Sequence, residues 1–157
     1  MFRTIAVAHD GTERSQVAAR YAAALAHEHS GRIVVAHVRE LIGGRGAGPL
    51  HVDEDERTAA VRSTVADLRA QGIETELRIA STLRSPATVI AEIADRAQAD
   101  VVVAGGTTHG ALAGALTGST PQRLLHAAHC PVLIASAREQ ARESRPAGAT
   151  ERTPIAA

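Results

Sequence analysis

A glycine-rich stretch that follows an apolar run carries the residues best suited to hold phosphate. The run Val101–Ala104 is short, rich in β-branched residues and typical of a buried strand, and it ends at Gly105-Gly106. The segment 119–121, Ser-Thr-Pro, then has the composition of a helix start. Glycine lets a ligand approach the backbone, and the free N–H groups and dipole of a helix start favour an anion. This order predicts phosphate binding, although a glycine loop can also be a plain turn.

An aspartate near the amino terminus is the second candidate for ligand binding. Asp10 follows the short apolar run Thr4–Ala8 and precedes Gly11-Thr12, where a helical pattern begins. A carboxylate at the end of a strand can accept hydrogen bonds from a ribose, or it can simply cap the next turn. If the strands at 4–8 and 101–104 are neighbours, Asp10 and the glycine loop face each other across one crevice.

Strand and helix patterns alternate along the chain and predict one α/β domain with a doubly wound five-stranded parallel sheet. The expected strands are 4–8, 32–38, 74–79, 101–104 and 132–135. Four helices are expected between them, with Thr12 and Ser85 as caps, a capping box from Asp53 to Glu56, and a start at 119–121. The glycine-rich segment 41–52 predicts a mobile loop. The domain is expected to span 1–137, followed by a disordered tail at 138–157.

Composition narrows the function classes. The 157 residues include 17 basic side chains, all arginine, and 17 acidic ones, so the charge balance gives no reason to expect nucleic acid or an anionic membrane as a partner. The absence of lysine excludes Schiff-base chemistry and the G-x-x-x-x-G-K-[ST] phosphate loop. A single cysteine, the lack of a signal-like start and the lack of a long apolar segment favour a cytoplasmic protein.

The eight histidines invite a metal hypothesis, which the spacing does not favour. His126 and His129 are three residues apart and can share a helix face, but no cysteine or carboxylate set completes a zinc site. We expect the histidines to be solvated at the surface. His109 differs because it lies within the glycine loop, where it either contacts a phosphate or lies on the rim. Cys130 precedes Pro131 and is expected to be inert packing.

The spacing of the glycine loop resembles that of the universal stress protein family. The family pattern is G-x-x-G, nine residues, then G-[ST], and this chain has Gly105, Thr108 in place of the second glycine, and Gly118-Ser119. The closing segment 128–134, AHCPVLI, is similar to the last strand of the family, and 7–12, VAHDGT, is similar to its opening V-x-V-D-G-S. The resemblance covers about residues 3–136.

The resemblance implies a Rossmann-like fold with the strand order 3-2-1-4-5 and a bound adenine nucleotide. ATP, with Mg²⁺ as an accompanying ion, is the first expectation. AMP and cyclic AMP are the alternatives because Thr108 and Pro121, which lacks an N–H, depart from an ideal phosphate loop. By position, the implied binding residues are Asp10, Val38, Gly105, Thr108, His109, Gly110, Gly118, Ser119 and Thr120. Val38 is also a core candidate, and Ser119 is either a helix cap or a phosphate donor.

The expected function is that of a stress-response regulator that binds the nucleotide with little or no hydrolysis. The alternatives are a nucleotide-free dimeric scaffold, a weak ATP hydrolase, or an enzyme of related fold. Related ligases and hydrolases place S-G-G-x-D-S after the first strand, where this chain reads His9-Asp10-Gly11-Thr12. A homodimer through the last strand, Val132–Ile134, is expected, because an apolar edge strand favours pairing and the resemblance implies the same contact.

Overall fold

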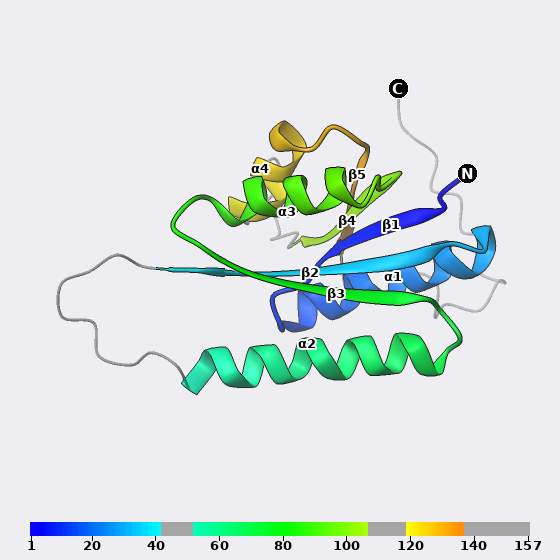
Figure 1. The fold of residues 1–157 in the computed structure, drawn as a ribbon, viewed down its shortest axis with the longest axis horizontal. Coiled ribbons are helices and arrows are strands. Elements are labelled where there is room, and N and C mark those ends of the chain that lie inside the picture. The colour runs from blue at the N-terminus through cyan, green and yellow to red at the C-terminus, as the bar shows by residue number, and fades with distance from the viewer. Residues whose placement is uncertain (42–51, 107–118, 137–157) are drawn as a thin grey trace, which may run out of the picture.

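The computed structural model describes residues 1–41, 52–106 and 119–136 as alternating strands and helices (Figure 1). The strands are β1 (Thr4–Ala8), β2 (Arg32–Glu40), β3 (Thr75–Thr82), β4 (Val101–Gly106) and β5 (Val132–Ser136). The helices are α1 (Glu13–His29), α2 (Val52–Ala70), α3 (Pro86–Arg96) and α4 (Ser119–Ala127). Each expected strand and helix is therefore present, with ends that differ by a few residues.

The strands form one parallel sheet in the order β3-β2-β1-β4-β5, which confirms the predicted fold. Helices α1 and α2 cover one face, and α3 and α4 cover the other (Figure 1). The winding reverses between β1 and β4, where Val7 pairs with Val103 and Ala8 with Ala104. A reversal of this kind opens a crevice at the carboxyl ends of the strands.

Side chains alternate between the two faces and make two separate cores. In β1, Ile5 and Val7 join the core under α1 and α2, whereas Ala6 and Ala8 join the core under α3 and α4. All five residues of this strand are buried, because a parallel sheet is covered on both sides. The two central strands, β1 and β4, are therefore apolar from Ile5 to Ala8 and from Val101 to Ala104.

Helix starts are where the structure departs from the sequence-based expectations. Thr12 and Ser85 occupy the N-cap positions of α1 and α3, but neither side chain makes a capping hydrogen bond. Helix α2 begins at Val52, so the predicted capping box at 53–56 lies inside the helix and is wrong in register. Helix α4 begins at Ser119, which places Pro121 third rather than first. The predictions for 42–51 and for the tail fall outside the described residues.

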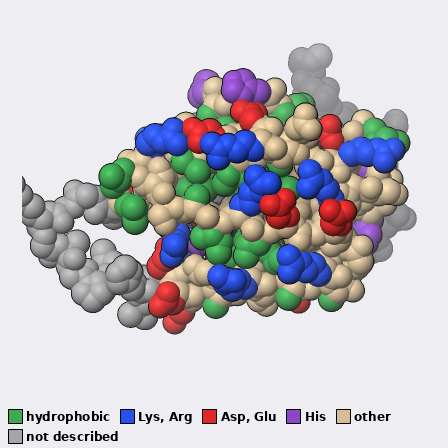
Figure 2. Space-filling model, viewed as in Figure 1, with side chains coloured by type: hydrophobic (Ala, Val, Ile, Leu, Met, Phe, Trp, Pro, Cys, Tyr) green, Lys and Arg blue, Asp and Glu red, His purple; other side chains and the backbone are tan. Residues whose placement is uncertain are grey.

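Charged side chains of both signs intermingle on the surface. On the face shown in Figure 2, arginines lie beside acidic residues over the open β3 edge and its flanking helices. Arg78 pairs with Glu76 at 2.8 Å, and Arg84 pairs with Glu92 at 2.7 Å. Within the described ranges, none of the helices has both the length and the apolar character that a membrane span requires.

The anchoring of α4 beside the crevice can be tested with two adjacent leucines. Leu124 is 0% exposed in the core under α3 and α4, whereas Leu125 is 47% exposed. Leu124→Ala is expected to lower the free energy of unfolding by about 2–5 kcal/mol, because it leaves a cavity. Leu125→Ala, the matched control, is expected to change it by about 0.5 kcal/mol or less. Urea denaturation measures both, and equal losses would contradict this packing of α4.

Candidate functional site

A pocket of about 490 Å³ opens at the carboxyl ends of β1, β2 and β4. Four of the residues implied by the sequence line it together: Asp10, Val38, Gly105 and Thr120. Ser119 lies next to it as the first residue of α4. The other implied residues, Thr108, His109, Gly110 and Gly118, lie outside the described residues. Four positions taken from distant parts of the sequence thus converge on one cavity at the winding reversal.

One wall of the pocket is apolar and made of small side chains. Ala8, Ala36 and Ala104 lie side by side on three adjacent strands on the α3 side of the sheet, and Val38 and Ile90 extend this wall. Val38 is half-buried there, which combines the core and the lining roles considered from the sequence. A wall of this kind suits a flat apolar group.

Asp10 is an ionised acceptor at the mouth of the pocket. Its Oδ1 accepts hydrogen bonds from the backbone N–H of Thr12 at 3.0 Å and from the Thr12 hydroxyl. Partial burial opposes ionisation, but the Thr12 hydrogen bonds, with Ser15 and the Arg14 guanidinium, hold the pKa of Asp10 below its ordinary value. The Thr12 hydroxyl therefore fixes the carboxylate instead of capping α1.

Two glycines allow helices to approach the strand ends closely. A Cβ at Gly105 would overlap the backbone carbonyl of Arg14 in the first turn of α1. A Cβ at Gly11, which has a φ of +80°, would lie 2.7 Å from the Cα of Arg57 in α2. Gly105 therefore has a packing role that holds whether or not a ligand is bound.

Two buried histidines border the same pocket, and the expectation that all histidines are solvated is wrong for them. His9 and His37 are each 2% exposed. Residues 9 and 37 continue the inward alternation of Ile5-Val7 and Ile33-Val35, and this period-2 phase is the signal that predicts their burial. Hydrogen bonds compensate the loss of water at both ring nitrogens of His37 and at Nδ1 of His9, but the buried Nε2 of His9 has no partner among the described residues.

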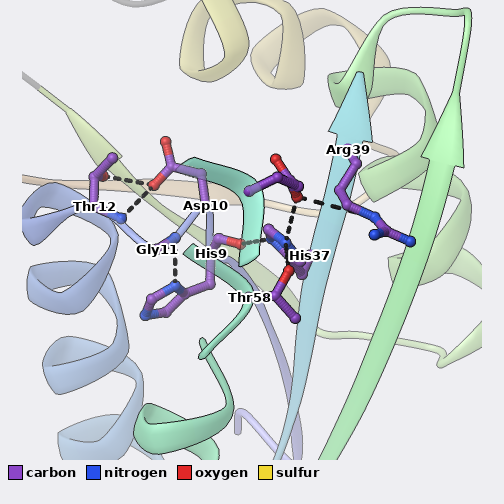
Figure 3. Close-up of polar contacts among 8 residues, drawn as sticks. His9, Asp10, Gly11, Thr12, His37, Arg39 and Thr58 are labelled. Atoms are coloured by element: carbon purple, nitrogen blue, oxygen red, sulfur yellow. Dashed lines mark hydrogen bonds and ion pairs between the residues drawn. The ribbon is translucent and has the colours of Figure 1, made fainter. Parts of the chain in front are cut away.

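The ring of His9 is held neutral. Its Nδ1 accepts a hydrogen bond from the N–H of Gly11 at 3.1 Å, which places the ring proton on Nε2 (Figure 3). Burial lowers the pKa of His9 to about 4, with Asp10 opposing this shift and His37 adding to it. By contrast, His129 is exposed, as expected, and its Nδ1 lies 2.8 Å from the Asp95 carboxylate.

His37 connects three elements through its two ring nitrogens (Figure 3). Nδ1 lies 2.9 Å from the backbone oxygen of His9. Nε2 lies 3.2 Å from Oε1 of Glu54 and 3.3 Å from the hydroxyl of Thr58, both on α2. His37, which extends from β2, thereby links the loop that carries Asp10 to the first turns of α2.

Metal and thiol chemistry receive no support from the part of the chain that the structure describes. Within it, His, Cys, Asp and Glu side chains form no group of three or more with the geometry to hold a metal ion. Burial, with the nearby Asp95 carboxylate, raises the pKa of the Cys130 thiol above its ordinary value. Cys130 packs against the core under α3 and α4, in line with its expected inert role.

Comparison with known proteins places this architecture in a family. The model of the universal stress protein family matches residues 1–136. The chain belongs to the universal stress protein family. A universal stress protein of Thermus aquaticus is 31% identical over 138 residues, which cover 85% of this chain and 98% of that protein.

Two solved structures of universal stress proteins share the fold. One, described as a complex with cAMP, is 24% identical, covers 85% of this chain and 96% of its own, and has a TM-score of 0.64. The other, from Archaeoglobus fulgidus and described as a complex with dAMP, is also 24% identical, covers 85% and 97%, and has a TM-score of 0.64.

The neutral state of His9 predicts a loss of stability in acid. Because its pKa falls from 6.5 to about 4 on folding, the unfolded chain takes up the proton first. The stabilisation is complete above pH 6.5 and is lost as the pH falls towards 4, by on the order of 3 kcal/mol in total. His9→Asn keeps an acceptor for Gly11 N–H in an Asx-type turn but removes the titration.

Urea unfolding of wild type and His9→Asn at about pH 7 and about pH 4.5 measures this contribution. Wild type is expected to lose more stability than the variant between the two conditions. The carboxylates titrate in both proteins alike, so the difference between the two losses of stability belongs to the His9 ring. Identical losses would contradict a buried, neutral His9.

Proposed function

We propose that this universal stress protein is a cytoplasmic regulator that binds an adenine nucleotide in the pocket between the Asp10 loop and the Gly105 end of β4. The observation that carries the proposal is the convergence of Asp10, Val38, Gly105 and Thr120 on one pocket at the winding reversal. Structural relatives described with cAMP and dAMP support the choice of an adenine nucleotide. A volume of about 490 Å³ is also in the range of small-molecule sites.

The parts of the pocket match the parts of a nucleotide. The aliphatic wall around Val38 receives the adenine ring, and the ionised Asp10 accepts hydrogen bonds from ribose hydroxyls. The N-terminus of α4, which begins at Ser119, provides backbone N–H groups for phosphate, and Arg14 and Arg57 add positive charge from the opposite side. ATP, with Mg²⁺, is the first candidate ligand, and AMP and cyclic AMP are the alternatives.

Little or no hydrolysis is proposed, because Asp10 and His9, the two titratable groups at the end of β1, already have hydrogen-bond partners within the protein. Asp10 is engaged by Thr12, and its lowered pKa makes it a weak base. His9 is buried, and its Nδ1 already accepts the Gly11 N–H. A nucleotide-free scaffold is the competing proposal, because the packing of Gly11 and Gly105 explains both glycines without a ligand.

Calorimetric titration of ATP, ADP, AMP and cyclic AMP tests the proposal. Wild type is expected to bind at least one of them with micromolar or weaker affinity, about −8 kcal/mol or less favourable. Asp10→Ala is expected to weaken binding about tenfold or more by removing the ribose acceptor. Asp67→Ala, an exposed carboxylate on α2, is the matched control and should bind as wild type does. No binding of any nucleotide would favour the scaffold, and rapid ATP turnover would favour an enzyme.

A homodimer through β5 is the proposed assembly. β5 is an edge strand of the sheet, Val132 and Ile134 are half-buried, and Leu133 is 38% exposed. An apolar edge strand favours pairing with a second copy. Leu133→Lys is expected to convert the dimer to a monomer with the fold retained. Leu83→Lys, at a 75% exposed leucine after β3, is the control. Sedimentation measures both, and a wild-type monomer at micromolar concentration would contradict the dimer.

A further inference from the structure

The polar cluster around His37 lies on the wall of the pocket opposite the apolar one. Glu54 of α2 contacts both His37 and Arg39, which lie two residues apart on β2. The Thr58 hydroxyl, also from α2, contacts His37 (Figure 3). His37, Arg39 and Glu54 all line the pocket. The nucleotide-binding roles proposed above use none of these side chains.

The hydrogen-bond chemistry of the cluster favours a proton between His37 and Glu54. The backbone oxygen of His9 can only accept, so Nδ1 of His37, 2.9 Å away, carries a proton. In the neutral ring, Nε2 is then an acceptor that faces an acceptor-only carboxylate oxygen of Glu54 at 3.2 Å. This contact is attractive when a proton lies between the two atoms, as in an imidazolium–carboxylate pair.

Each partner in the cluster has a second contact for the deprotonated state. The Thr58 hydroxyl, 3.3 Å from Nε2, can donate a hydrogen bond to the neutral ring. Glu54 also lies 3.9 Å from Nε of Arg39, two residues along β2 from His37. Oε1 of Glu54 therefore lies near two side chains of the same strand, the always cationic Arg39 and His37, which is cationic only when protonated.

We propose that His37 is a positioning residue of the nucleotide pocket, and that the proton it shares with Glu54 holds α2 against the Asp10 loop. The inference rests on the proposed nucleotide binding. His37 holds the His9 carbonyl, which directly precedes Asp10, through its Nδ1–H, and the proton on Nε2 adds the contact with the helix that carries Arg57 onto Gly11. A nucleotide that contacts Asp10 binds this held state better, so its affinity rises as the pH falls and the proton is taken up.

Several charged or titratable groups surround His37. From the end of β1 it faces His9, which stays neutral, and Asp10, which stays ionised. From α2 it faces Glu54, with Arg57 also on the pocket wall, and on β2 itself Arg39 and Glu40 follow. The register partner on β3, Ile79, is uncharged. Histidine ordinarily changes charge between about pH 5 and 8, where these carboxylates and arginines do not.

Two variants separate proton sharing from packing. Glu54→Gln places an amide that donates to the neutral Nε2, so the α2 contact no longer needs the proton. His37→Asn retains a donor for the His9 carbonyl but has no titrating nitrogen. Glu56→Gln, at an exposed glutamate of the same helix, is the matched control. ATP and cyclic AMP are titrated calorimetrically into each full-length protein at about pH 6 and about pH 8.

The measured quantity is the ratio of Kd at the higher pH to Kd at the lower pH. Dividing the wild-type ratio by that of Glu54→Gln cancels the ionisation of the nucleotide, and the quotient is expected to be about 5–10. Glu56→Gln should keep the wild-type ratio, and His37→Asn should lose it. A quotient near one would overturn the proposal, and so would a wild-type ratio retained in His37→Asn.

Nitrogen-15 chemical shifts of the His37 ring in the ligand-free protein make the test independent of nucleotide. Nδ1 is expected to be protonated at both pH values, and Glu54→Gln should lower the titration midpoint of Nε2. A neutral ring that carries its proton on Nε2, or a midpoint unchanged by Glu54→Gln, would overturn the shared proton. If wild type binds no nucleotide at either pH, the proposed function and the coupling both fail, whereas the ring shifts still decide the shared proton.

Discussion

The parallel pairing of β1 with β4 is the constraint on which the rest of the structure depends. It brings together two strands that are more than ninety residues apart, with Ile5 opposite Val101 and Ala8 opposite Ala104. Because β2 pairs with the other side of β1, the chain winds in opposite directions from this centre, and three strand ends open on one crevice. The absence of a side chain at Gly105 then lets α1 begin directly against the end of β4.

Core composition shapes the ligand pocket as much as the loops do. The chain has one Phe, one Tyr and no Trp, so its interior is built from Ala, Val, Leu and Ile. On the α3 side of the sheet, Ala8 of β1 and Ala104 of β4 lie side by side, and this leaves an aliphatic wall of small side chains. In the proposed complex, a base on this wall would be held by dispersion and by the polar groups at its edge rather than by stacking on a described aromatic ring. Orientation of Asp10 therefore matters more for specificity than the wall itself.

Apolar runs and periodicity predicted the sheet, the helices and, with the family-like spacing, the strand order. Helix caps were not predictable in the same way, because the hydrogen-bond partner of a hydroxyl depends on which groups the fold places within reach of it. Thr12 bonds Asp10 rather than a free N–H of α1. The burial of His9 and His37 was missed because residue type favours the surface, whereas alternation along β1 and β2 places both side chains inward. Both ring nitrogens of His37 have partners from other elements, whereas for His9 only Nδ1 is satisfied, and its buried Nε2 has no partner among the described residues.

The alternation of side chains between the two faces of the sheet also explains why one pocket has two chemically different walls. Val38 faces the α3 side of the sheet, and its neighbours His37 and Arg39 face α2, so a ligand at the strand ends meets an aliphatic surface on one side and titratable groups on the other. The peptide unit between His9 and Asp10 joins the two sides: its carbonyl is held by His37, and the following residue presents the carboxylate. In the proposed coupling, a change in how His37 is held would reach Asp10 through this one peptide unit. Such a short path needs no rearrangement of the sheet, whose central strands are buried on both faces and resist displacement.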